Sequence, residues 1–147
     1  MSSVKGVNYT NITADPIVKV DSEVLGGKIR VSYDSYEASS LASGSDITIG
    51  RIPTNATIMD VVLKCDALGG SSTLTVGDSG DADRYLAAVG TWNAAGQVQS
   101  MLGGSTAANT AMGGLGYRTT AETDIIITTG GATTNGSIHV WIMYTVE

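Results

Sequence analysis

The run Thr57-Ile58-Met59-Asp60-Val61-Val62-Leu63-Lys64-Cys65-Asp66 predicts a central β-strand. Its apolar side chains recur at every second position, at Met59, Val61, Leu63 and Cys65. A period of two is that of a strand with one buried face, because successive side chains of a strand point to opposite sides. We therefore expect these four side chains to lie in a hydrophobic core.

Further strand-like segments separated by turn residues lie on both sides of this run. Pro53 and Asn55 favour a turn before it, and Gly69-Gly70 favours one after it. The expected strands are 16–20, 28–34, 46–51, 72–76, 83–89, 97–102, 123–128 and 137–146. For 83–89 the alternative is one helical turn capped by Asp81, and we favour the strand. We expect 36–45 to be a loop and the last two strands to form a hairpin.

In the expected strand 28–34, the apolar residues alternate with polar ones. Ile29, Val31 and Tyr33 alternate with Lys28, Arg30, Ser32 and Asp34. This pattern is typical of a half-buried antiparallel strand with one solvated face. We therefore predict that Ile29, Val31 and Tyr33 face the core.

The composition favours a single all-β domain. The chain has 147 residues with 19 glycines, 15% charged residues and no Phe, and it is rich in Thr, Ser, Val and Ile. The polar segment 1–15 is expected to be a flexible N-terminal arm, and 16–147 a single β-sandwich domain. About eight short antiparallel strands suit a jelly-roll-like β-sandwich.

Charge and hydropathy argue against two classes of partner. The net charge is −6 and the eight basic residues are spread singly, so we expect no nucleic-acid partner. The longest apolar run, 140–144, is far too short to span a bilayer, so we expect no membrane partner. The single Cys65 cannot form an intramolecular disulfide, and no signal-peptide core is evident, which favours folding in a reducing cytoplasm.

No set of residues in the sequence predicts catalysis or a cofactor. His139 is the only histidine and lies within an expected strand, and no cysteine or histidine cluster completes a zinc site or a dyad with Cys65. We interpret both as packing residues. The interpretation as an enzyme would need a cleft that holds His139 and Cys65 together.

Asp78, Asp81 and Asp83 are weak candidates for a metal site. They lie at i, i+3 and i+5 around a glycine, and a hard cation such as calcium prefers oxygen ligands. The spacing does not match an EF-hand loop, and no Glu follows that could provide the last ligand of such a loop. We favour the alternative in which Asp78 and Asp81 bond backbone amides in a turn, while Asp83 pairs with Arg84 or Arg51.

Five residues are candidates for contacts with another protein. The final strand is apolar on both faces, because Trp141 and Met143 lie opposite Ile142 and Tyr144. Either a second layer or another subunit must cover Trp141 and Met143. The remaining candidates, Met112, Leu115 and Tyr117, lie in the long Gly-rich segment 103–120, which is either a partner-contacting loop or an ordinary surface loop.

Three segments resemble a known family. They are GGKIRVSYD at 26–34, IGRIPTNATIMDVVL at 49–63 and VGDSGDADRYL at 76–86. Over roughly 25–90 the chain resembles the capsid decoration, or cement, proteins of tailed bacteriophages. The resemblance implies a jelly-roll-like β-sandwich that forms homo-oligomers, most plausibly trimers, and bridges major capsid subunits. It implies that the protein has no active site. It also implies that the protein assembles in the host cytoplasm and lies on the outside of the virion capsid.

An alternative function from a different class stays open at this point. The chain could be a carbohydrate- or receptor-binding β-sandwich module of a phage tail appendage. In that interpretation Trp92, Asn93 and nearby carboxylates would form a sugar platform.

Overall fold

The structure is a computed structural model of the chain, and it describes residues 4–20, 26–89, 92, 94–103 and 114–146. These residues form one short helix and eight strands. The elements are α1 (Val7–Ile12), β1 (Arg30–Leu41), β2 (Asp46–Ile52), β3 (Ala56–Cys65), β4 (Thr73–Asp78), β5 (Asp81–Val89), β6 (Gln97–Ser100), β7 (Thr123–Gly130) and β8 (Thr134–Val146).

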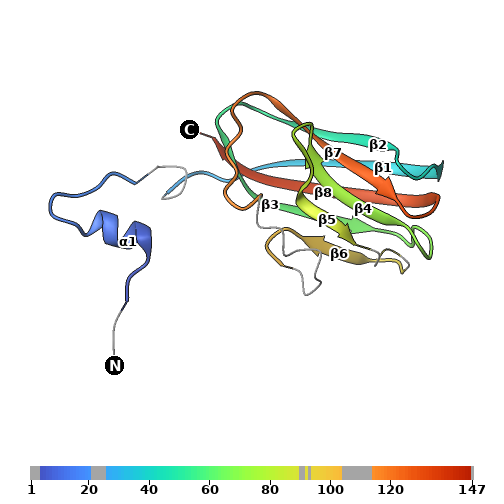
Figure 1. Cartoon of the computed structure of the whole chain (residues 1–147), viewed down its shortest axis with the longest axis horizontal. Coiled ribbons are helices and arrows are strands. Elements are labelled where there is room, and N and C mark those ends of the chain that lie inside the picture. Colours follow the sequence, from blue (N-terminus) through green and yellow to red (C-terminus); the bar gives the residue numbers. More distant parts are fainter. Residues whose placement is uncertain (1–3, 21–25, 90–91, 93, 104–113, 147) are drawn as a thin grey trace.

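The strands form two antiparallel sheets that pack face to face (Figure 1). One sheet has the order β1-β8-β3-β6, and the other has the order β2-β7-β4-β5. The chain changes sheet at every connection between successive strands except the one from β4 to β5. This nested order is that of a jelly roll. The predicted all-β, jelly-roll-like sandwich of about eight antiparallel strands is therefore confirmed.

The core lies between the two sheets, and β3 contributes to it much as its sequence pattern predicts. Val61, Leu63 and Cys65 are buried, as predicted, but Met59 is exposed and Ile58 is buried in its place. The register of β3 against β8 shifts between Ile58 and Asp60, so β3 has an extra residue there. Such a bulge reverses the faces on which the preceding side chains lie.

The predicted hairpin of the last two strands is wrong. β7 pairs with β2 and β4, whereas β8 pairs with β1 and β3, so the two strands lie in different sheets. Both strands have an apolar face, and these faces meet in the core, where Ile127 of β7 and Val140 of β8 are fully buried. Packing of the two sheets against each other buries both faces, because each sheet covers the apolar face of the other.

Two predictions for the N-terminal half are also wrong. Residues 16–20 form no strand, and part of the expected loop 36–45 continues β1 as far as Leu41. The face of β1 is inverted relative to the prediction, since Ile29, Val31 and Tyr33 are 62%, 57% and 52% exposed. In the register of the sheet, Tyr33 lies opposite Trp141, so it shares the outer face of Trp141 and not the inner face of Ile142.

The N-terminal segment lies outside the two sheets (Figure 1). It contains α1, a helix of six residues that the sequence pattern does not predict. Its apolar side chains are largely exposed, among them Val7 and Tyr9. The first strand of the sandwich begins only at Arg30, and the division at residue 15 into an arm and a domain stays a prediction.

Candidate interaction surface

The outer face of the β1-β8-β3-β6 sheet has exposed apolar side chains. In β8, Ile138, Val140 and Ile142 point into the core, so His139, Trp141 and Met143 point outward by the alternation of a strand. The second sheet lies on the inner side. Within the described part of the chain no second layer covers Trp141 and Met143, which are half-buried only by their neighbours.

Three aromatic side chains lie together on this face and form what we call the aromatic cluster: Tyr33, His139 and Trp141. The ring centroids of Tyr33 and Trp141 are 5.1 Å apart, and each of these rings lies 6.2 Å from that of His139. Tyr33 Oη and His139 Nδ1 are hydrogen-bonded at 2.8 Å. The mutual contacts fix the rings on the sheet, so the aromatic cluster is a preformed, partly apolar surface.

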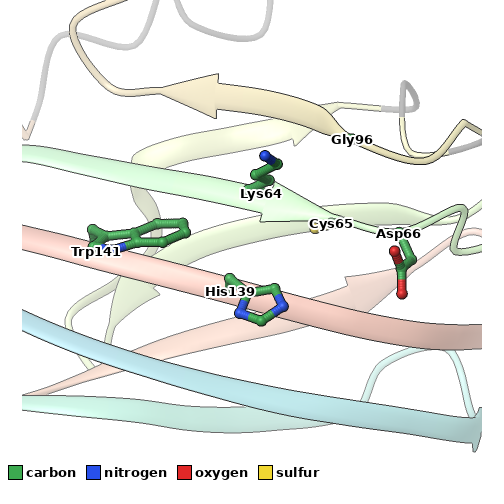
Figure 2. A pocket seen from close by; sticks show the side chains of 6 residues that line it. All are labelled: Lys64, Cys65, Asp66, Gly96, His139 and Trp141. Atoms are coloured by element: carbon green, nitrogen blue, oxygen red, sulfur yellow. The ribbon is translucent and has the colours of Figure 1, made fainter.

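A hollow of about 330 Å³ lies beside the aromatic cluster. Its lining residues are Lys64, Cys65, Asp66, Gly96, His139 and Trp141. Figure 2 shows the side chains of Lys64, His139 and Trp141 standing over β3 and β8. Lys64 and His139 lie opposite each other in the register of these strands. The hollow therefore combines the Trp141 ring with a cationic and an anionic side chain, Lys64 and Asp66.

His139 and Cys65 both line this hollow, yet they do not form a dyad. The Cys65 side chain belongs to the core cluster on the inner face of β3, and His139 points outward from β8. Burial, with a smaller effect from the charge of Asp66, raises the pKa of the Cys65 thiol to about 12. A thiol that stays protonated at neutral pH is a poor nucleophile. The geometry agrees with the interpretation of Cys65 as a packing residue.

The three candidate contact residues in the segment 103–120 differ in their surroundings. Met112 lies outside the described residues. Leu115 is partly exposed and lines an apolar hollow of about 260 Å³ with Met59 and Leu102. Tyr117 packs against the core, and its ring lies under the Arg84 guanidinium at 4.1 Å. Of the two described candidates, only Leu115 thus presents its side chain as an apolar surface contact.

The carboxylate of Asp78 is occupied by protein donors. Its Oδ2 accepts bonds from Arg84 Nε at 2.7 Å and from Tyr85 Oη at 3.0 Å. Its Oδ1 accepts bonds from the backbone N–H groups of Gly80 and Asp81 at 2.9 and 3.2 Å. The predicted turn role of Asp78 is therefore seen, and a cation would have to displace these donors.

The other predicted contacts of this acidic turn are partly different from those observed. The partner of Arg84 is Asp78 and not Asp83, while Arg51 pairs with Asp124 and Glu122. The chain reverses between β4 and β5, which brings Arg84 back beside the buried Asp78. Asp81 accepts a long bond of 3.4 Å from the N–H of Asp83. No group of three or more His, Cys, Asp or Glu among the described residues is placed to hold a metal ion.

The buried cluster around Asp78 shifts the pKa of its members. Burial alone would raise the pKa of Asp78, but the bonds from Arg84, Gly80 and Tyr85 outweigh it and the net shift is downward. Burial and the nearby Asp78 carboxylate raise the pKa of Tyr85. Asp78 is therefore a charged, fully engaged structural group.

The sugar platform expected at Trp92 and Asn93 does not fit the structure. The Trp92 side chain is 1% exposed and belongs to the core cluster, so its ring cannot stack on a ligand. The large apolar area of the Trp92 side chain fills the core instead. Asn93 lies outside the described residues.

Sequence reasoning found part of the outer face and missed the rest. Trp141 and Met143 are recognisable because the last strand is apolar on both sides. The sequence pattern predicts Val31 and Tyr33 in the core because their strand has one apolar face, which is ordinarily the buried one. Only the register of β1 against β8 places Tyr33 beside Trp141.

Comparisons with known proteins place this fold among phage capsid chains. A chain of the cyanophage Pam1 capsid asymmetric unit is 26% identical, with a TM-score of 0.67 over 88% of this chain and 93% of that one. A chain of the Ralstonia phage GP4 capsid is 20% identical, with a TM-score of 0.60 over 82% and 86%. One from the acidic stable capsid of Helicobacter pylori bacteriophage KHP30 is 10% identical, with a TM-score of 0.58 over 80% and 87%.

The sequence itself matches no protein family and no curated protein. The chain thus has the fold of chains found in phage capsids. The single helix that the described residues form is too short to cross a membrane.

Proposed function

We propose that this protein decorates the outer surface of a tailed-phage capsid and stabilises it by bridging major capsid subunits. The observation that carries the proposal is the likeness to the Pam1 capsid chain, which spans nearly the whole of both chains at 26% identity. A match of this extent means that the two chains are similar in size and built from the same single jelly roll. The resemblance of 26–34, 49–63 and 76–86 to decoration proteins supports the same role.

The outer face of the β1-β8-β3-β6 sheet is suited to contacts between proteins. Protein interfaces are enriched in Tyr, Trp and Met and depleted in charged residues at their centres. Val31, Tyr33, Trp141 and Met143 provide such a surface on adjacent strands. We propose that a neighbouring subunit or the capsid covers it.

The proposed assembly is a homo-oligomer, most plausibly a trimer, bound to the major capsid protein. Trp141 and Met143 are its proposed contacts, joined by Leu115 and by Met112. Tyr117 is the weakest of these candidates, because it already packs against Arg84 and the core. The proposed location is the exterior of the virion, after assembly in the host cytoplasm.

We propose no catalytic role, no cofactor and no structural metal. The side chains of His139 and Cys65 point to opposite faces of the sheet, and Asp78 is engaged by protein donors. The carbohydrate-binding alternative is not supported, because Trp92 is buried and its ring cannot stack on a sugar.

The decisive experiment mixes the purified protein with phage capsids that lack it. Sedimentation should recover the protein with the capsids at a saturable ratio, and decorated capsids should melt at a higher temperature than bare ones. A parallel array of glycans serves as the comparison. Binding to glycans without binding to capsids would overturn the proposal in favour of the receptor-binding alternative.

A further inference from the structure

Residues 16–20 have the sequence of a strand but no strand partner in the described chain. Pro16-Ile17-Val18-Lys19-Val20 is an apolar, β-branched run with proline at the position where a strand tolerates it. In the structure its Ile17 and Val18 side chains are 73% and 49% exposed. The backbone N–H of Val18 bonds to Asn11 O at 3.0 Å, and no described strand pairs with the segment.

Strand β1 provides an open edge of the kind that accepts an added strand. It lies at the end of its sheet, and among the described strands it pairs with β8 alone. It is 12 residues long, and its pairing with β8 runs without a bulge from Arg30 to Ala38. A long, regular edge strand presents a row of unpaired N–H and C=O groups to any other extended chain.

The other sheet edges are less suited to this role. The edge strand β6 has only four residues, while β2 and β5 each have a register shift in their pairing. Short strands and bulges are features that discourage the pairing of a further strand. β1 has neither over its first nine residues, and its Val31 and Tyr33 are exposed beside the open edge.

We propose that residues 17–20 of a second copy of this chain pair with the free edge of β1 as an additional strand. The inference rests on the self-association put forward above and names the segment that brings it about. Pairing would satisfy backbone groups on both sides and would place either Ile17 or Val18 beside Val31 on the outer face of the sheet. Residues 17–20, which we call the exchanged arm, would then join each subunit to its neighbour.

A second copy suits this edge better than the same chain does. The N-terminal segment of a subunit lies outside its own sandwich and leaves its own β1 edge uncovered (Figure 1). An arm that reaches from each subunit to the next one around the assembly forms a heterologous contact, and such contacts generate a ring, for example a trimer, when the rotation between subunits closes. Both halves of the contact are present in every copy of the chain.

Cysteine cross-linking between separately purified variants tests the pairing. A tagged Ile17→Cys or Val18→Cys protein is mixed with an untagged Val31→Cys protein and oxidised. In the matched control, an untagged protein with Ala88→Cys on the edge strand β5 replaces the Val31→Cys protein. Because Ile17 and Val18 point to opposite faces of a strand, one of them should cross-link to Val31→Cys at least tenfold more than the other. Native Cys65 is buried and does not interfere.

Proline substitutions provide an independent measurement. Successive N–H groups of a strand point to opposite edges, so either Val18→Pro or Lys19→Pro removes a bond to β1. That variant should lose the oligomer in light scattering, while Lys19→Ala keeps it. All variants should fold, since 17–20 makes no strand contact with its own sandwich.

The outcomes separate this inference from the proposed function. No cross-link to β1, equal cross-linking to Ala88→Cys, or oligomers that survive both proline variants would overturn the arm exchange. A bond formed only within one chain, in a double Ile17→Cys and Val31→Cys variant, would overturn the second copy as the occupant. Capsid binding without arm cross-linking refutes only the arm exchange, and arm cross-linking without capsid binding refutes only the decoration role.

Discussion

Tyr33 and Trp141 face each other across the pairing of β1 with β8, with ring centroids 5.1 Å apart on the outer face of the sheet. Two residues separated by more than a hundred positions in sequence thus form one apolar surface. The surface is not covered by the second sheet, and it is the part of the described molecule best suited to a protein partner.

Replacing Trp141 with alanine should weaken association far more than folding. A large aromatic anchor in an interface is worth about 2 kcal/mol or more of association energy. Because Trp141 lies on the outer face, its loss opens no core cavity, and the thermal midpoint should change little. Light scattering and thermal melts measure the two effects.

Two control variants calibrate the Trp141 result. Thr48→Ala changes an exposed residue of the other sheet, away from this face, and should alter neither property. Trp92→Ala removes a core side chain and should cost roughly 3–5 kcal/mol of folding energy. A Trp141→Ala protein that stays assembled but melts as low as Trp92→Ala would assign Trp141 to the core.

Asp78→Asn should destabilise the fold by about 3 kcal/mol. The substitution leaves the partly buried Arg84 guanidinium without its carboxylate, and breaking a buried ion pair is costly. Asp83→Asn, an exposed change in the same turn, should be close to neutral. Denaturant unfolding of the three proteins gives the free energies, and equal stabilities would refute the structural role of Asp78.

The contribution of Asp78 should disappear in acid. The folded pKa of Asp78 is below its ordinary value of 3.8, so the unfolded chain takes up the proton first as the pH falls. The stability difference between the wild type and Asp78→Asn should be constant above about pH 5 and should shrink below pH 4. A difference that grows on acidification would contradict the assignment.

Calcium and chelators should leave the thermal midpoint unchanged. The Asp78 oxygens already accept bonds from Arg84, Tyr85 and two backbone amides, so a cation gains few free ligands. A ligand that binds only the native state must stabilise it. A rise of many degrees with calcium that is abolished by Asp81→Ala would reveal a metal site.

Deleting residues 1–14 should weaken capsid attachment and leave folding intact. The described part of this segment lies outside the sandwich, and its apolar side chains are exposed. The deletion keeps 16–20, so the oligomer should also persist. A truncated protein that unfolds, or that binds capsids as well as the full chain does, would count against the prediction.

Cys65 should resist thiol reagents in the native protein. It is buried and its pKa is raised to about 12, so thiolate is scarce at pH 8. Its reaction with a maleimide should be slow in buffer and complete in guanidinium chloride. Rapid labelling of the native protein would mean that the thiol reaches the hollow beside His139.

The sequence alone was sufficient to predict the class of the fold and most of its strands. The alternation of Val61, Leu63 and Cys65 and the turns around them identify a buried strand, because a period of two is a local property of the chain. The same holds for β2, β4, β5 and β7, which lie close to their predicted positions.

Only the tertiary structure decided which strands are partners and which faces are buried. The short connection 131–133 favours a hairpin, yet β7 and β8 lie in opposite sheets, since their apolar faces are buried by meeting across the core. Val31 and Tyr33 look like core residues, yet their register with Met143 and Trp141 places them outside. Pairing and register depend on contacts between residues distant in sequence, and the local pattern does not contain them.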